Sequence, residues 1–263
     1  MLGAIIGDIA GSRFEWDNIK SKEFALFTNR CRPTDDSVMT LAIAQALMNC
    51  EGDIERLGAE AVSCMQALGR KYPEAGYGGH FCRWLSSNHP LPYHSFGNGS
   101  AMRVSPCAWA AKSLEQAKAM AKAVTEVTHD HPEGLKGAEA TAGAVYLALH
   151  GSSIPEIREY ISEEYYALDF TLDEIRADYS FDVSCQGSVP QAITAFLESE
   201  SFEDAIRNAI SIGGDSDTIA AIAGGIAGAF YGVPETLRQQ ALRFLDDAQK
   251  NILNCFAQRF GQK

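Results

Sequence analysis

The stretch from residue 34 to residue 48 has the sequence Thr-Asp-Asp-Ser-Val-Met-Thr-Leu-Ala-Ile-Ala-Gln-Ala-Leu-Met. Its apolar residues recur at the three- and four-residue spacing of a helix, so we expect a helix over residues 38–48. Thr34 and the two acids after it are typical of a helix start, because they cap free backbone N–H groups and complement the helix dipole. The stretch therefore predicts a helix that begins at an acidic cluster.

The same helical spacing runs through most of the chain. It predicts further helices over residues 54–70, 114–127, 135–150, 190–199, 202–212, 217–231 and 235–258. Alternation of apolar and polar residues is scarce, and the sequence lacks repeated strand-then-helix units, which argues against a doubly wound sheet. Clusters of Gly, Pro, Asn and Ser predict loops over residues 71–80, 86–100 and 178–190. We predict an all-α fold.

Composition limits the kind of protein this is. The chain has 263 residues, of which 46% are hydrophobic, and no Pro-, Ser- or charge-rich linker divides it, so we expect one domain over residues 1–263. The formal net charge of -12 argues against general binding to nucleic-acid phosphates or to an anionic membrane. Seven cysteines without a CxxC pair suggest neither a disulfide framework nor a zinc site, and a reducing compartment fits best. Asp8 interrupts the apolar N-terminal run before it reaches membrane-spanning length, so we expect a cytoplasmic protein.

Glycines recur at four-residue spacing near both ends of the chain, at Gly3, Gly7 and Gly11 and again at Gly224 and Gly228. Glycine inside a helix costs about 0.5–1 kcal/mol relative to alanine, so these runs predict helices whose backbones pack unusually close. A membrane-type helix dimer is the alternative. The segment 217–231 argues against it, because it carries an acid and its apolar run is short.

A second acidic cluster precedes the predicted helix 217–231, with the sequence Gly213-Gly214-Asp215-Ser216-Asp217-Thr218. Either cluster alone could be a helix cap. Together their carboxylates and hydroxyls form the all-oxygen ligand set that Mg²⁺, Mn²⁺ or Ca²⁺ prefers. Dipole stabilisation is worth about 0.3–1 kcal/mol per charge, whereas two like charges about 4 Å apart repel by about 4 kcal/mol at a dielectric near 20. If the clusters meet in the fold, cations must offset the repulsion.

The loop over residues 95–103 is a candidate ligand-binding segment. Glycines on both sides of Asn98 allow close backbone approach, so the amides and Ser100 could cradle a phosphate. A hairpin turn at Asn98-Gly99 is the alternative. The flanking residues do not alternate as strands do, which favours the ligand loop.

Three further residues were considered for a role in catalysis or binding. Two of them have two open interpretations, and the third shows no sign of a catalytic role. His129 precedes a predicted helix and either contacts substrate or stands beside a cap formed by Thr128 or Asp130. Glu15 is either an exposed helix end or a functional carboxylate. Cys185 has no basic neighbour in the sequence that would mark it as a nucleophile.

These segments, taken in order, resemble the ADP-ribosylglycohydrolase family, which includes the dinitrogenase reductase-activating glycohydrolase and the ADP-ribosyl-acceptor hydrolases. The resemblance spans nearly the whole chain, and the matching blocks are 7–15, 34–37, 97–103 and 213–218, with 128–129 as a weaker fifth. It implies a single-domain, all-α orthogonal helix bundle that holds two divalent cations, Mg²⁺ or Mn²⁺, at the base of an ADP-ribose cleft.

The resemblance also implies roles for individual residues. The metal ligands would be Thr34, Asp35, Asp36, Asp215, Asp217 and Thr218. Substrate-binding residues would be Gly97, Asn98, Gly99, Ser100, Ala101, Met102 and His129. Glu15 would lie beside the metals, and either Glu15 or Asp36 would take a proton from the attacking water. Some members have an acid just before the glycine-asparagine-glycine loop, where this chain has Ser95 and Phe96.

The implied reaction is hydrolysis of the glycosidic bond between ADP-ribose and an acceptor, through an oxocarbenium-like state. We expect ADP-ribosylated protein, modified on arginine, as the substrate, because the family's bacterial prototypes act on it. Serine-linked, O-acetyl- and nucleobase-linked ADP-ribose remain alternatives, and the acidic composition disfavours a nucleic-acid partner. A metal-dependent phosphohydrolase and a non-catalytic ADP-ribose binder are competing classes, and the sequence does not indicate an oligomeric state.

Overall fold

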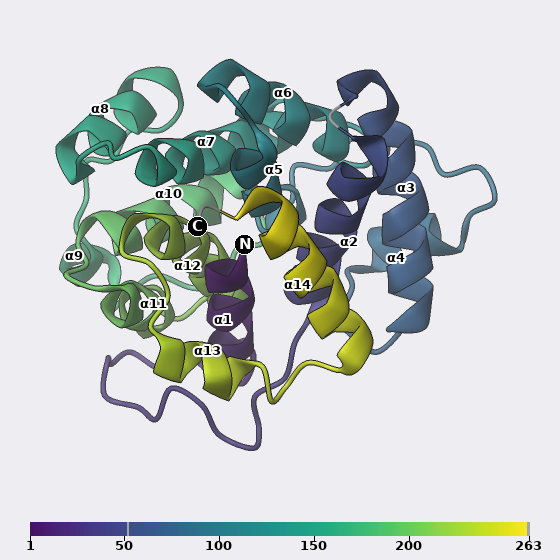
Figure 1. Cartoon of the computed structure of the whole chain (residues 1–263). Helices are drawn as coiled ribbons and strands as arrows, with labels where there is room; N and C mark the ends of the chain where they lie inside the picture. Colours follow the sequence, from purple (N-terminus) through teal and green to yellow (C-terminus); the bar gives the residue numbers. More distant parts are fainter. Residues whose placement is uncertain (52, 262–263) are drawn as a thin grey trace.

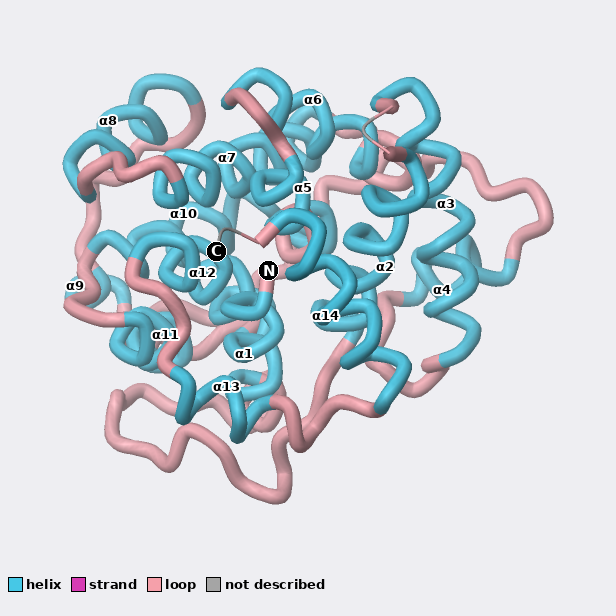
Figure 2. Tube along the Cα trace, viewed as in Figure 1, coloured by secondary structure: helices cyan, strands magenta, loops and turns pink. Residues whose placement is uncertain are grey.

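A computed structural model describes residues 1–51 and 53–261 of the chain (Figure 1). Helices make up the fold, and the described residues contain no strand (Figure 2). The all-α prediction is confirmed. In chain order the elements are α1 (Leu2–Gly11), α2 (Asp35–Cys50), α3 (Ile54–Lys71), α4 (Gly79–Ser86), the 3-10 turn η1 (Asn98–Ser100), α5 (Ser105–Ala110), α6 (Leu114–Thr125), α7 (Pro132–Leu149), α8 (Ile154–Glu164), α9 (Leu172–Ile175), α10 (Cys185–Leu197), α11 (Phe202–Ser211), α12 (Ser216–Phe230), α13 (Glu235–Ala241) and α14 (Asp247–Phe260).

Helices α1 and α12 pack against each other near the middle of the bundle (Figure 1). A Cβ added at Gly3 would overlap the Gly224 carbonyl oxygen, and one at Gly7 would overlap that of Ala220. The third glycine, Gly11, lies against the first turn of α12. The prediction of two helices in close backbone contact is therefore confirmed, and the pairing brings the end of α1 to the start of α12.

The other helices surround this pair. Helix α2 contacts α1, α3, α5 and α14, while α10, α11 and α7 pack on α12. In Figure 1, α2, α3 and α4 lie on one side of the molecule and α8 to α11 on the other. Among the described residues no helix is both long and apolar enough to cross a bilayer.

Two of the predicted helices differ most from the structure. Helix α10 begins at Cys185, five residues earlier than we expected from Pro190, because the Ser184 side chain caps the helix by accepting from the Gly187 N–H. The predicted helix 235–258 is broken into α13 and α14. Asp246 starts the second helix by forming a capping box with Gln249.

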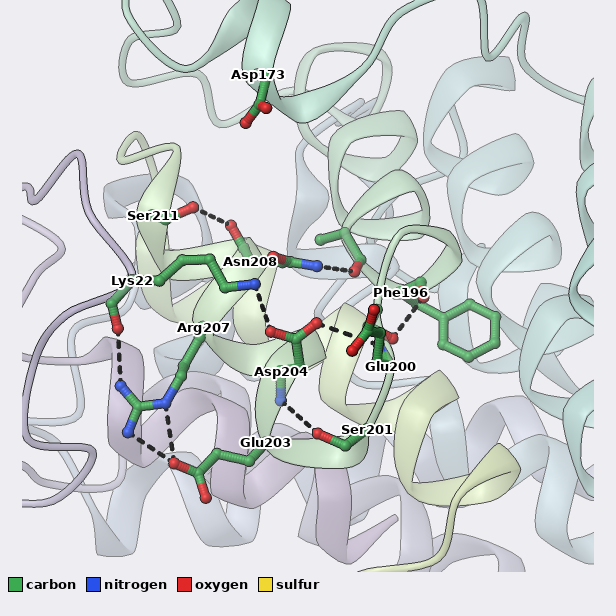
Figure 3. A network of polar contacts seen from close by, with 12 residues as sticks. Lys22, Asp173, Phe196, Glu200, Ser201, Glu203, Asp204, Arg207, Asn208 and Ser211 are labelled. Atoms are coloured by element: carbon green, nitrogen blue, oxygen red, sulfur yellow. Dashed lines mark hydrogen bonds and ion pairs between the residues drawn. The ribbon is translucent and has the colours of Figure 1, made fainter.

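A long loop over residues 12–34 joins α1 to α2 and runs along one side of the bundle (Figure 2). Side chains of α11 hold it in place. Arg207 donates to the Lys22 carbonyl oxygen at 2.9 Å and also binds Glu203, while the Lys22 ammonium pairs with Asp204 (Figure 3). These contacts fix the loop that carries Glu15.

Candidate active site

The two acidic clusters, 182 residues apart in the chain, meet in the fold. The Thr218 hydroxyl donates to Asp36 Oδ2 at 3.3 Å. Carboxylate oxygens of Asp8, Asp36 and Asp217 lie within 4.8 Å of one another, and the same holds for Glu15, Asp215 and Asp217. Asp217 belongs to both groups, so the carboxylates form one continuous acidic centre.

Helix ends position this centre. Thr34 caps α2, which places Asp35 and Asp36 in its first turn. Gly213 and Gly214 precede α12 with φ angles of 70° and 74°, a backbone conformation that favours glycine. That turn places Asp215 at the cap of α12 and Asp217 in its first turn.

Asp8, which was not among the residues assigned a role, is fully buried in α1 and organises the start of α2. It accepts hydrogen bonds from the Thr34 N–H at 2.9 Å, from the Thr34 hydroxyl at 2.6 Å and from the N–H and hydroxyl of Ser37. An acid inside an otherwise apolar helix was the signal that could have identified it. Thr34, expected as a metal ligand, thus has its hydroxyl engaged by Asp8 and does not line the cavity described below.

The electrostatics of the centre call for positive charge. Burial, followed by repulsion from Asp8, raises the pKa of Asp35 to about 8. Burial likewise raises the pKa values of Asp36 and Asp217, and neighbouring carboxylates raise them further. Asp36 Oδ1 is buried without a hydrogen-bond partner. A hard divalent cation satisfies both features, because it binds unpartnered carboxylate oxygens and offsets their repulsion.

A cavity of about 700 Å³ opens above the acidic centre. Its walls include predicted residues from both halves of the chain, namely Glu15, Asp35, Asp36, Gly97, Asn98, Gly99, Met102, His129, Asp215, Asp217 and Thr218. They also include residues that the sequence pattern did not single out, among them Trp16, His80, Arg83, Tyr93 and Val183. His80 and Arg83 belong to the short helix α4 and the other three to loops, and none of them is part of a recognisable motif, so sequence reasoning had no means of finding them.

The glycine-asparagine-glycine segment is attached directly to the acidic centre. Asn98 Nδ2 donates to Asp215 Oδ2 at 2.7 Å, and the segment forms the 3-10 turn η1 rather than a hairpin. Ser100 and Ala101 are fully buried and do not line the cavity. The Ser100 hydroxyl donates instead to the Gly97 carbonyl oxygen at 3.1 Å, so it supports the loop from behind.

His129 lies against the Gly97–Gly99 segment and is held there by its neighbours. Its Nδ1 lies 2.7 Å from the Thr128 hydroxyl, which accepts from Arg103 at 2.7 Å. Burial and the Arg103 charge lower the pKa of His129, so the imidazole is neutral at physiological pH. The cap of α7 is His131, whose Nδ1 accepts from the Glu133 N–H, and not Thr128 or Asp130.

Cys185 is closed off from the cavity. It is fully buried, and its thiol lies 3.1 Å from the Ser100 hydroxyl. Burial raises its pKa to about 12. It therefore lacks the exposed thiolate character of a nucleophile.

Comparison with known proteins agrees with this arrangement. A family model described as ADP-ribosylglycohydrolase matches residues 1–262. The chain belongs to the ADP-ribosylglycohydrolase family. As a member of that family it is a hydrolase that acts on ADP-ribosyl compounds.

Individual relatives cover most of this ADP-ribosylglycohydrolase. ADP-ribosylhydrolase ARH3 of Homo sapiens is 27% identical over 91% of this chain and 87% of its own length. ADP-ribosylarginine hydrolase Tri1 of Pseudomonas putida (strain GB-1) is 27% identical over 89% of this chain and 70% of its own. A solved structure titled ADP-ribosylglycohydrolase-related protein complex shares the fold, with a TM-score of 0.73 and 22% identity over 99% of this chain and 96% of its own.

Proposed function

We propose that this enzyme uses two divalent cations, Mg²⁺ or Mn²⁺, to hydrolyse the glycosidic bond between ADP-ribose and an arginine side chain of a modified protein. The observation that carries the proposal is the meeting of both acidic clusters at one end of a cavity large enough for a nucleotide sugar. The reaction would release ADP-ribose.

The proposed ligands of the cations are Asp35, Asp36, Asp215, Asp217 and Thr218, all of which face the cavity. Such cations supply Lewis-acid polarisation of sugar hydroxyls and acidification of water. Thr34 keeps its place in the proposal as the residue that orients the start of α2, through Asp8. The unpartnered Asp36 Oδ1 is the strongest single support for cation binding.

We assign the proton acceptor to Glu15 and give Asp36 a mainly ligating role. Asp36 is almost fully buried and accepts from Thr218, whereas Glu15 is only partly buried and reaches the cavity. Burial, together with Asp215, raises the pKa of Glu15. A carboxylate whose pKa is raised toward neutrality is a better base for a water proton.

ADP-ribose would lie along the Gly97–Gly99 segment and His129. Gly97, Asn98, Gly99 and Met102 form one wall, and Ser100 and Ala101 support that wall from behind. His129, as a neutral imidazole, would contribute a hydrogen bond rather than charge. The walls would also exclude water from the bond that breaks.

An arginine leaving group is supported by two observations. The Pseudomonas putida relative is described as an ADP-ribosylarginine hydrolase. The surroundings of the acidic centre also favour a cationic acceptor over a neutral one, because Glu15, Asp215 and Asp217 lie within 4.8 Å of one another there.

The test is ADP-ribose release from an ADP-ribosyl-arginine peptide by metal-depleted protein, with and without added Mg²⁺ or Mn²⁺. The proposal expects activity only with the cation. Equal rates in the presence of a chelator would contradict the metal mechanism, and formation of AMP with ribose 5-phosphate would indicate phosphohydrolase chemistry instead.

A further inference from the structure

Three exposed apolar side chains lie in the cavity lining or stack on one of its residues. Among the described residues, the large hydrophobic side chains most open to solvent are Trp16 (79% exposed), Leu91 (73%), Val183 (54%), Phe96 (47%) and Phe181 (42%). Trp16 and Val183 line the cavity, and Phe181 stacks on Trp16. Single exposed apolar residues are common on protein surfaces, whereas exposed apolar groups clustered at a cleft indicate a binding surface.

Trp16 and Phe181 form a flat aromatic pair on the rim. Their ring centroids are 5.0 Å apart and their planes differ by 25°. Trp16 directly follows Glu15, and both residues line the cavity. The pair is therefore next to the acidic centre.

Both segments that carry the pair are tied to the start of α12. Asn18 Nδ2 donates to the Gly214 carbonyl oxygen at 2.9 Å and to that of Phe14 at 2.6 Å. Asn18 Oδ1 accepts from the Gly214 N–H at 2.8 Å. Lys20 Nζ donates to the carbonyl oxygens of Tyr179 and Ile212, each at 2.6 Å. The rim is consequently held in place before any ligand arrives, which reduces the entropy cost of binding.

We propose that Trp16 and Phe181 form the leaving-group subsite and that the guanidinium of the ADP-ribosylated arginine stacks on the exposed indole. The inference rests on the proposed function, since it names what recognises the acceptor in that reaction. The susceptible bond must lie at the acidic centre, so the leaving group emerges beside Glu15 and Trp16.

A guanidinium suits this place better than a serine hydroxyl does. It is planar and cationic, it stacks on aromatic faces, and tryptophan is the strongest cation–π partner. The Glu15 carboxylate lies beside the indole, whereas the nearby Asp17 is already paired with Arg30 at 3.3 Å. A serine hydroxyl offers neither a plane nor a positive charge, so the subsite would not assist it.

The experiment compares Trp16→Leu, Trp16→Phe and Phe181→Leu with the wild type, using an ADP-ribosyl-arginine peptide as substrate and Mg²⁺ in excess. Loss of the cation–π contact in Trp16→Leu should lower kcat/KM about two- to thirtyfold. Trp16→Phe should retain most activity, and Phe181→Leu should fall between the two. The affinity for free ADP-ribose, measured by calorimetry, should be unchanged in all three variants.

Two failures can be told apart. If the wild type binds ADP-ribose but releases none from the arginine-linked peptide, the proposed reaction is wrong and the subsite is overturned with it. If the wild type is active but Trp16→Leu has the same kcat/KM, only the subsite is wrong. An equal loss of ADP-ribose affinity in Trp16→Leu also overturns the subsite, because the indole would then serve ADP-ribose binding or the fold.

Discussion

The floor of the cleft is built from helix ends, whereas its rim is built from loops. At the floor, Asp8, Asp36 and Asp217 are fixed by α1, α2 and α12, and the close packing of α1 on α12 depends on glycines. At the rim, Glu15 and Trp16 belong to the loop 12–34, which side chains such as Arg207 and Asn18 hold against the bundle. The arrangement of the carboxylates in the floor therefore depends on backbone packing, while the position of the rim depends on individual hydrogen bonds.

Gly7→Ala should have the largest effect, because it disrupts the packing of the helices that form the floor. The new Cβ would overlap the Ala220 carbonyl oxygen, which cannot move without separating α1 from α12. We expect the free energy of unfolding to fall by about 3 kcal/mol or more, measured by urea denaturation. Gly79→Ala is the matched control, because a Cβ there meets no atom within 4 Å, and it should stay within about 0.5 kcal/mol of the wild type. Equal stability of the two variants would contradict the packing argument.

Asp36→Asn and Glu15→Gln distinguish the role of the floor in cation binding from the role of the rim in proton transfer. Each should lower kcat about a hundredfold or more, because one removes a cation ligand and the other the proton acceptor. Calorimetry with Mn²⁺ should show weakened binding for Asp36→Asn and little change for Glu15→Gln. The assignment of roles fails if Glu15→Gln loses the cation as Asp36→Asn does.

The pH dependence of stability should reveal the crowded carboxylates of the floor. The folded-state pKa of Asp35 is raised from 3.8 to about 8, so between these values the native protein binds more protons than the unfolded chain. The stability of metal-depleted protein should therefore fall as pH rises from about 4 to about 8, lowering Tm by several degrees. Saturating Mg²⁺ should remove most of this fall. A Tm of the metal-depleted protein that rises steadily over this range would be inconsistent with the buried acidic centre.

Arg207→Met should have the smallest effect and should act on the rim. The variant loses hydrogen bonds to the carbonyl oxygens of Lys22 and Phe24, so we expect about 1–2 kcal/mol lower stability. Loosening the loop of Glu15 should lower kcat/KM severalfold and leave Mn²⁺ affinity unchanged. The exposed Arg243, changed to Met, is the control and should match the wild type. A loss of Mn²⁺ affinity in Arg207→Met would show that floor and rim are not independent.

The sequence predicts the long helices well because they carry an apolar face. Helix α3 begins at Ile54, as expected, and ends at Lys71, one residue beyond the expected end. The break between α13 and α14 escapes such reasoning because apolar Leu242 and Leu245 continue the pattern through the turn. Pro190 suggested a helix start, but it lies inside α10, so the predicted helix began too late.

The candidate site is only partly predictable for a related reason. Motifs rich in Asp, Thr and Gly are visible in the sequence. That they meet at one cavity was expected only from the resemblance to the family. Local sequence does not show which way a side chain points, so Ser100 was expected at the cavity although it faces Gly97 and Cys185. Asp8 lies in the matching block 7–15 but was assigned no role, and Trp16 lies just outside that block, so only the fold shows that both are at the acidic centre.

Titration of metal-depleted protein with Mn²⁺, with the bound ions counted by electron paramagnetic resonance, tests whether the two acidic clusters bind a pair of divalent cations. We expect two Mn²⁺ ions per chain, close enough for their spins to couple, and loss of this coupled signal in Asp36→Asn. A wild-type protein that binds no Mn²⁺, or whose coupled signal is unchanged in Asp36→Asn, would contradict this expectation.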